Sequence, residues 1–179
     1  MKIIGIGGSL RDESYAYIVL NHALNRAKQA GWDIELIDLR ELQLPFCHGG
    51  EDYRQYPDVG ILRKAVQSAH GIILVSPEYH GSVSGILKNA LDLLEEGDIK
   101  GKVVATVGIL GGAFGHGVTN TLGHICRHLH AWVVPLDLLI PNAGKAFNEK
   151  GELIDIVLCK RMDELVDLLL DGARKLGNA

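Results

Sequence analysis

The stretch KIIGIGGSLRDES, residues 2–14, contains a short apolar run, a glycine–serine turn and the polar start of a helical pattern. The apolar run predicts a strand at Lys2–Ile6, and the spacing after the turn predicts a helix over Glu13–Gln29. The turn between them offers backbone N–H groups and small hydroxyl side chains at a helix start, where anions bind. The stretch therefore predicts a strand–loop–helix unit whose loop is suited to hold an anion.

The same alternation of short apolar runs with longer helical stretches continues along the chain. Near-continuous apolar runs are typical of parallel strands that are covered on both faces. The remaining predicted strands are Ile34–Asp38, Gly71–Val75, Lys102–Val107 and Ala131–Val134, and the remaining predicted helices are Pro57–Ala69, Ser84–Glu96, Gly117–His130 and Ile156–Leu176. Five strands alternating with helices favour an α/β fold, a flavodoxin-like doubly wound parallel sheet in the order 2-1-3-4-5 with helices on both faces. Ligands of such sheets bind beyond the carboxyl ends of the strands, so we examine the loops after the first, third and fourth strands.

Composition limits the classes of partner. The 179 residues fit one domain, 1–179, and the formal charge of −4 argues against a nucleic-acid partner, which needs a basic face. Residues 103–126 carry no formal charge, but their six glycines favour a strand, a loop and a helix start over a membrane span. The cysteines at 47, 126 and 159 fit no metal or redox spacing, and the N-terminus has no signal-peptide pattern. We therefore expect a cytoplasmic protein with no membrane partner.

The first loop, GIGGSLRDES at residues 5–14, is neither a Walker phosphate loop nor a complete dinucleotide fingerprint. Ser9, Arg11 and Ser14 supply hydroxyl and guanidinium donors that suit the three oxygens of a terminal phosphate. Asp12 and Glu13 must then point away from that phosphate. Alternatively, Ser9 and Asp12 only cap the first helix. The sequence leaves both interpretations open.

The second and third loops suit a flat ligand. The second loop, SPEYHGSVSGILKN at residues 76–89, combines a stiffening proline, spaced glycines and the aromatic Tyr79, as a planar heterocycle requires. The third loop, GILGGAFGHG at residues 108–117, has five glycines in ten residues, which permits close approach of a ligand to the backbone. An ordinary strand–turn–helix connection and a flexible surface loop remain the alternatives.

Together these loops resemble those of the NADPH-dependent FMN reductase family, which includes quinone, azo-dye and chromate reductases. The matching pieces are GSLRDES at 8–14, SPEYHGSVSGILKNALD at 76–92 and GGAFG at 111–115. The resemblance implies a non-covalent FMN, with its phosphate on Ser9, Arg11 and Ser14 and its isoalloxazine ring over Pro77, Glu78, Tyr79 and His80. It also implies that Gly111 and Gly112 lie near the far edge of the ring. The chain departs from the family pattern at Ala16 and at His80, where the family often has asparagine.

The resemblance implies an NAD(P)H-dependent oxidoreductase that reduces a small acceptor such as a quinone, free flavin, azo compound or metal oxyanion. NADPH or NADH would be the electron donor. Hydride chemistry belongs to flavin N5, so we expect no catalytic side chain. A flavodoxin-type electron carrier and a flavin-binding regulatory subunit without turnover are the alternatives. We expect no metal site, because His124, His128 and His130 lack a carboxylate ligand in suitable register.

The predicted helix Ser84–Glu96 also bears on assembly. Leu87, Leu91 and Leu94 lie on one side of it, and Ile86, Ala90 and Leu93 lie toward another. A helix that is apolar on more than one face is buried on more than one face. We therefore expect a homodimer or homotetramer, in keeping with the usual state of the resembling family. The alternative is that a long loop such as Phe46–Tyr56 folds over the helix.

Overall fold

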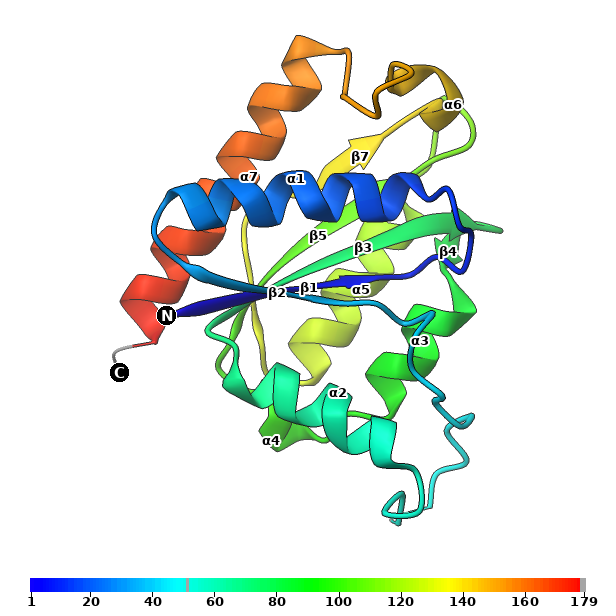
Figure 1. Cartoon of the computed structure of the whole chain (residues 1–179), viewed down its shortest axis with the longest axis vertical. Helices are drawn as coiled ribbons and strands as arrows, with labels where there is room; N and C mark the ends of the chain where they lie inside the picture. Colours follow the sequence, from blue (N-terminus) through cyan, green and yellow to red (C-terminus); the bar gives the residue numbers. More distant parts are fainter. Residues whose placement is uncertain (51, 178–179) are drawn as a thin grey trace.

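The computed structural model describes residues 1–50 and 52–177, and its centre is a parallel sheet (Figure 1). The main strands are β1 (Lys2–Gly7), β2 (Asp33–Ile37), β3 (Gly71–Tyr79), β5 (Val103–Ile109) and β6 (Trp132–Val133). They pair in the order β2-β1-β3-β5-β6, which is the predicted order 2-1-3-4-5 of the five main strands. The flavodoxin-like α/β prediction is confirmed.

Helices cover both faces of the sheet (Figure 1). On one face lie α1 (Tyr15–Gln29) and α7 (Ile156–Leu176), and on the other lie α2 (Pro57–Ser68), α3 (Gly85–Asp92), α4 (Glu96–Ile99) and α5 (Gly117–His128). Each face has its own apolar core, because the inward sides of these helices bury alternate residues of the strands. Within the described residues, no helix combines the length and apolarity needed to cross a bilayer.

The predicted number of strands is wrong, because the sheet has seven strands rather than five among the described residues. The short strand β4 (Ser82–Val83) pairs antiparallel with β3. The fifth predicted strand, Ala131–Val134, corresponds to β6, which pairs with the start of β5. A further strand that was not predicted, β7 (Leu138–Ile140), pairs with the end of β5. Pro135 lies between β6 and β7 and has no N–H for a ladder hydrogen bond, which accounts for the interruption there.

The prediction of a single helix over 84–96 is wrong, because the structure has two helices in this range. The first, α3, ends at Asp92, and α4 begins after Glu95. Glu95 and Asp98 form a capping box in which each side chain accepts a hydrogen bond from the other residue's backbone N–H. Such a box starts a new helix and ends the old one, because it satisfies the N–H groups that begin a helix.

The apolar faces of α3 were expected to be covered by a second copy of the chain. In the structure, the chain itself covers most of them. Leu87, Leu91 and Leu94, which the sequence places on one side of the predicted helix, are 0%, 2% and 8% exposed. Asn89 on α3 donates to the carbonyl oxygen of Pro45 (2.9 Å) and accepts from the backbone N–H of Cys47 (2.8 Å). The cover therefore comes from the preceding segment 42–47, which overlaps the predicted covering loop only at its start. Burial of α3 does not require a second copy of the chain.

Candidate functional site

The three predicted loops meet at one cavity of about 490 Å³ at the carboxyl edge of the sheet. The cavity brings together most of the predicted site residues, from segments far apart in the sequence. Its lining consists of Ser9, Arg11, Glu13, Ser14, Tyr15, Ala16, Pro77, Glu78, Tyr79, Ile109, Gly111, Ala143 and Gly144. His80 and Gly112 are the predicted residues that do not line it.

The first loop ends at Ser14, which is the residue that precedes α1. Its side chain makes no capping hydrogen bond within the described part of the chain, and Ser9 accepts from the backbone N–H of Arg11 (3.3 Å). Ser9 and Asp12 therefore do not cap α1, and the alternative interpretation of this loop is wrong. The hydroxyl of Ser14 and the first N–H groups of α1, which no helical carbonyl can reach, remain available for an anion.

Arg11 supplies a positive charge at this end of the cavity. Its guanidinium has no hydrogen-bond or ion-pair partner among residues 1–50 and 52–177. Asp12 stays out of the lining, as the phosphate interpretation requires, whereas Glu13 lines the cavity and opposes it. One unpaired guanidinium with two serine hydroxyls is a donor set that suits a phosphate group.

The loop lies directly on β3 and on the start of α3. Gly8 donates its backbone N–H to the carbonyl oxygen of Val75 (2.7 Å). A Cβ at Gly8 would lie 2.6 Å from Ser84 Oγ and 2.9 Å from Leu87 Cβ, so any side chain there would push the loop away. Glycine is therefore required at residue 8 for the loop to approach α3 this closely.

The second loop is a β-hairpin rather than an irregular loop. Strand β3 continues to Tyr79, and Tyr79 pairs with Ser82 of β4, which leaves His80 and Gly81 as a two-residue turn. Both turn residues have positive φ, 51° for His80 and 78° for Gly81, as a type I′ hairpin turn needs. His80 therefore lies at the exposed tip and does not line the cavity.

The hairpin is attached to the start of α5. The Glu78 carboxylate accepts a hydrogen bond from the backbone N–H of Val118 (3.1 Å), in the first turn of that helix. A Cβ at Gly117 would overlap the Gly81 carbonyl oxygen, so the helix can meet the turn only because residue 117 is glycine. These contacts hold Pro77–Tyr79 as a rigid wall of the cavity.

Besides the three loops, the short helix α6 (Ala143–Ala146) forms a further wall of the cavity, which the sequence did not predict. Ala143 and Gly144 line the cavity, and Asn142 before them donates its backbone N–H to the Gly112 carbonyl oxygen (2.9 Å). Gly112 thus positions this wall instead of lining the cavity. The pairing of β7 with β5 brings α6 beside the third loop, and both β7 and α6 are too short to give a periodic signal in the sequence.

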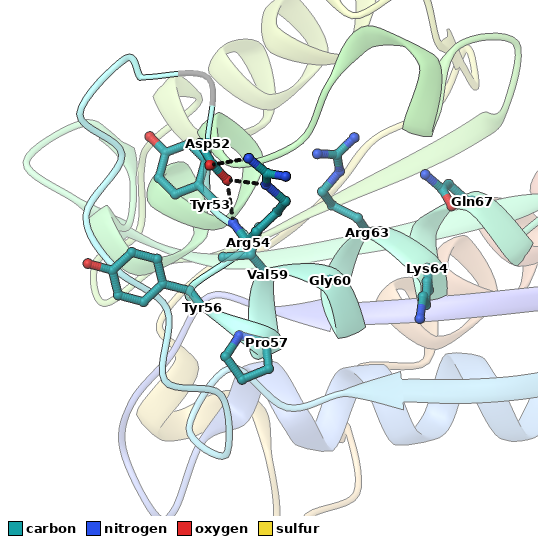
Figure 2. A pocket seen from close by; sticks show the side chains of 10 residues that line it. All are labelled: Asp52, Tyr53, Arg54, Tyr56, Pro57, Val59, Gly60, Arg63, Lys64 and Gln67. Atoms are coloured by element: carbon teal, nitrogen blue, oxygen red, sulfur yellow. Dashed lines mark hydrogen bonds and ion pairs between the residues drawn. The ribbon is translucent and has the colours of Figure 1, made fainter.

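A separate hollow of about 580 Å³ lies along α2 (Figure 2). Its arginines are already paired: Arg54 binds Asp52, and Arg63 binds Glu95 and Asp98. It contains none of the predicted site residues. In the described part of the chain, no three His, Cys, Asp or Glu side chains are grouped to hold a metal ion. Burial raises the pKa of Cys126 to about 12, so this thiol is not a nucleophile at neutral pH.

The cavity is lined by the donors of the first loop, by the hairpin and by the glycine-rich third loop. Together these features indicate the class of ligand that the cavity can hold. A cavity of this volume lies within the range of about 300–1,000 Å³ for small-molecule and cofactor sites. With phosphate donors at one end and backbone on two sides, at the carboxyl edge of a parallel sheet, the residues present fit an FMN. The fold is that of flavodoxin-like proteins.

The chain belongs to the NADPH-dependent FMN reductase family, whose model matches residues 1–145. It is 31% identical over 169 residues to an NAD(P)H-dependent FAD/FMN reductase of Geobacillus thermodenitrificans, covering 92% of this chain and 89% of that protein. It is 34% identical over 152 residues to an NAD(P)H:quinone oxidoreductase of Solanum tuberosum, covering 82% and 74%. The predicted family, with FMN as cofactor and NAD(P)H as electron donor, is confirmed, and the protein is an oxidoreductase.

Solved structures agree on the fold. A flavoenzyme NAD(P)H:(acceptor) oxidoreductase from Paracoccus denitrificans superposes with a TM-score of 0.75 at 23% identity, covering 98% of both chains. A flavodoxin from the domain Archaea superposes with a TM-score of 0.67 at 16% identity, covering 99% of both chains. Enzymes and a flavodoxin therefore share this fold, so the sequence relatives and not the fold distinguish the two functions.

Proposed function

We propose that this chain reduces a small planar acceptor, such as a quinone or an azo compound, with electrons from NADPH or NADH. The observation that supports this function best is the cavity itself, in which the unpaired Arg11 guanidinium lies with Ser9 and Ser14 at one end. FMN supplies the hydride chemistry when bound. Its phosphate would meet these three residues, and its ring would lie along Pro77–Tyr79 with Gly111 at its edge.

The chain's own contribution is binding and orientation. Arg11 and the helix start neutralise the phosphate dianion, and the hairpin wall limits the ring to one plane. Backbone N–H groups of the hairpin are suited to stabilise negative charge on a reduced ring. No side chain is assigned a proton-transfer role. Tyr79 lines the cavity and is 49% exposed, so it is placed to contact an aromatic acceptor.

We further propose that residues 1–179 act as one FMN-binding domain, in the cytoplasm, as a homodimer or homotetramer. The assembly proposal now rests on a groove of about 310 Å³ between α3 and α5, where Ile125 and Leu129 are half-buried. Leu91 and Leu94 also line this groove, although they are only 2% and 8% exposed.

Anaerobic reduction tests the enzymatic function. Purified protein loaded with FMN is mixed with NADPH or, separately, with NADH, and the flavin absorbance is followed before and after a quinone is added. An enzyme loses its oxidised flavin absorbance with at least one donor, faster than free FMN does under the same conditions, and the quinone restores it. Bound FMN that neither donor reduces would establish the carrier or regulatory-subunit function instead.

A further inference from the structure

The first loop is supported from behind by a side chain that no motif includes. Arg40 follows β2, and its Nη1 donates to the carbonyl oxygens of Arg11 (3.1 Å) and Asp12 (3.2 Å). Arg40 does not line the cavity; it lines a neighbouring hollow of about 570 Å³. One guanidinium thus holds two consecutive carbonyl groups of the loop that carries the phosphate donors.

These two bonds decide where the loop directs its N–H groups. In a trans peptide the carbonyl and the following N–H point in opposite directions, and the described chain has no cis peptide. The N–H groups of Asp12 and Glu13 therefore point away from Arg40. With its carbonyl oxygens bound to Arg40, the loop does not present them to an anion, which they would repel.

The charge of Arg40 is itself neutralised, so it does not act as a phosphate ligand. Its Nε donates to Asp38 Oδ1 (2.8 Å), and its Nη2 donates to Asp38 Oδ2. With two bonds to the loop, four of the five guanidinium N–H groups are used. The bond from Arg40 holds the pKa of Asp38 below its usual range, so the pair stays charged at neutral pH.

The guanidinium is also held in place by the ring of Tyr17. Arg40 Cζ lies 4.0 Å from the ring centroid, a cation–π distance. The buried Tyr17 hydroxyl donates to the Gly7 carbonyl oxygen (3.2 Å) and accepts from the Leu39 N–H (3.2 Å). Both ends of the first loop are therefore attached to the segment that follows β2.

We propose that Arg40 is a positioning residue that sets the preference of the site for FMN over riboflavin. This inference rests on the proposed placement of the FMN phosphate in the first loop. Arg40 orients the donors for the phosphate without touching the isoalloxazine ring. Its removal should therefore weaken binding of the phosphate and leave binding of the ring unchanged.

The chain contains a matched control. Arg54 forms the same Asp-x-Arg turn with Asp52, with backbone and Nε bonds of 2.9 Å and 3.0 Å to Oδ1 (Figure 2). The corresponding bonds of Arg40 to Asp38 are 3.0 Å and 2.8 Å. Arg54 lines the hollow on α2 and not the flavin cavity. Arg54→Ala therefore removes the same charge and the same guanidinium bonds to an aspartate without altering the first loop.

The test is a comparison of dissociation constants for FMN and riboflavin, measured by titration of flavin fluorescence. In Arg40→Ala, the constant for FMN should rise about tenfold or more, the factor for a lost hydrogen bond of a charged group, while that for riboflavin stays unchanged. Arg54→Ala should change neither. Arg40→Lys should show the same selective loss in smaller degree, because one ammonium cannot reach Asp38 and both carbonyl groups.

Each other outcome overturns the inference. If Arg40→Ala weakens both flavins equally, the role of Arg40 is structural. If wild type prefers FMN and Arg40→Ala and Arg40→Lys keep that preference, the loop does not need Arg40. If wild type binds both flavins equally, the proposed phosphate site itself is wrong, and the inference falls with it. Circular dichroism identifies a variant that does not fold, and Arg40→Lys then replaces Arg40→Ala in the comparison.

Discussion

Single residues decide which groups reach the cavity. Arg11 is a charge without a protein partner in the described chain, whereas Glu78 binds the N-terminus of α5 and Gly112 binds α6. His80 departs from the asparagine that the family often has, yet histidine, like asparagine, is enriched at positive φ. The turn therefore keeps its geometry with either residue, and the departure does not disturb the cavity wall.

At this scale the sharpest prediction concerns Arg11. Arg11→Ala should weaken FMN binding by about 1.5–3 kcal/mol, the range for a hydrogen bond to a charged group, and should leave riboflavin binding unchanged. Isothermal titration with both flavins measures the effect. Arg127→Ala, which removes an exposed arginine on α5 outside the cavity lining, is the control. Equal affinities of wild type for the two flavins would contradict the assignment.

At the scale of elements, α3 shows how one helix joins the site to the rest of the fold. Its start supports Gly8 of the first loop, and its buried Asn89 holds the segment at Pro45–Cys47. Apolar side chains that the sequence assigns to an interface are covered in this way by the chain's own connection between β2 and α2. The helix is thus buried on two sides within one subunit.

Asn89→Ala should release that segment. The Cys47 N–H and the Pro45 carbonyl lose their partner, and we expect a loss of about 1–3 kcal/mol in the free energy of unfolding. Urea unfolding gives the change, and trypsin should cleave faster after the exposed Arg54 in the released loop. Asn120→Ala, at an exposed residue of α5, is the matched control. An unaltered cleavage rate in Asn89→Ala would show that Asn89 does not hold the loop.

At the scale of the whole molecule, the open question is assembly. Leu91 and Leu94 line the groove between α3 and α5 but are only 2% and 8% exposed, so substitution of either by glutamate would damage the core as well as an interface. The groove between α3 and α5, with the half-buried Ile125 and Leu129, is the surface that a second copy could still cover.

Ile125→Glu should therefore lower the molar mass measured by light scattering to that of a monomer, because it places a charge in an apolar contact. Ile61→Glu makes the same substitution at an exposed residue of α2 and should leave the mass unchanged. The midpoint of thermal unfolding, recorded for both variants, separates dissociation from unfolding. A monomeric wild type at micromolar concentration would contradict the homodimer and homotetramer alike.

By itself, the sequence determined the five main strands, their order and the three loops at the carboxyl edge. The apolar runs of these strands are long enough to show their pattern locally, and a parallel α/β alternation restricts the topology. It also predicted Ser9, Arg11 and Ser14 as phosphate donors, because glycine and hydroxyl residues between a strand and a helix indicate an anion site without knowledge of distant contacts.

Only the tertiary structure decided the rest of the site. Strands β4 and β7 and helix α6 are two to four residues long, too short for a periodic signal. Ala143 and Gly144 reach the cavity because β7 pairs with β5, and Arg40 reaches the first loop because β2 pairs with β1. These contacts join residues about 30 positions apart in the chain. Such placements depend on strand pairing across the sheet, and no local spacing in the sequence encodes them.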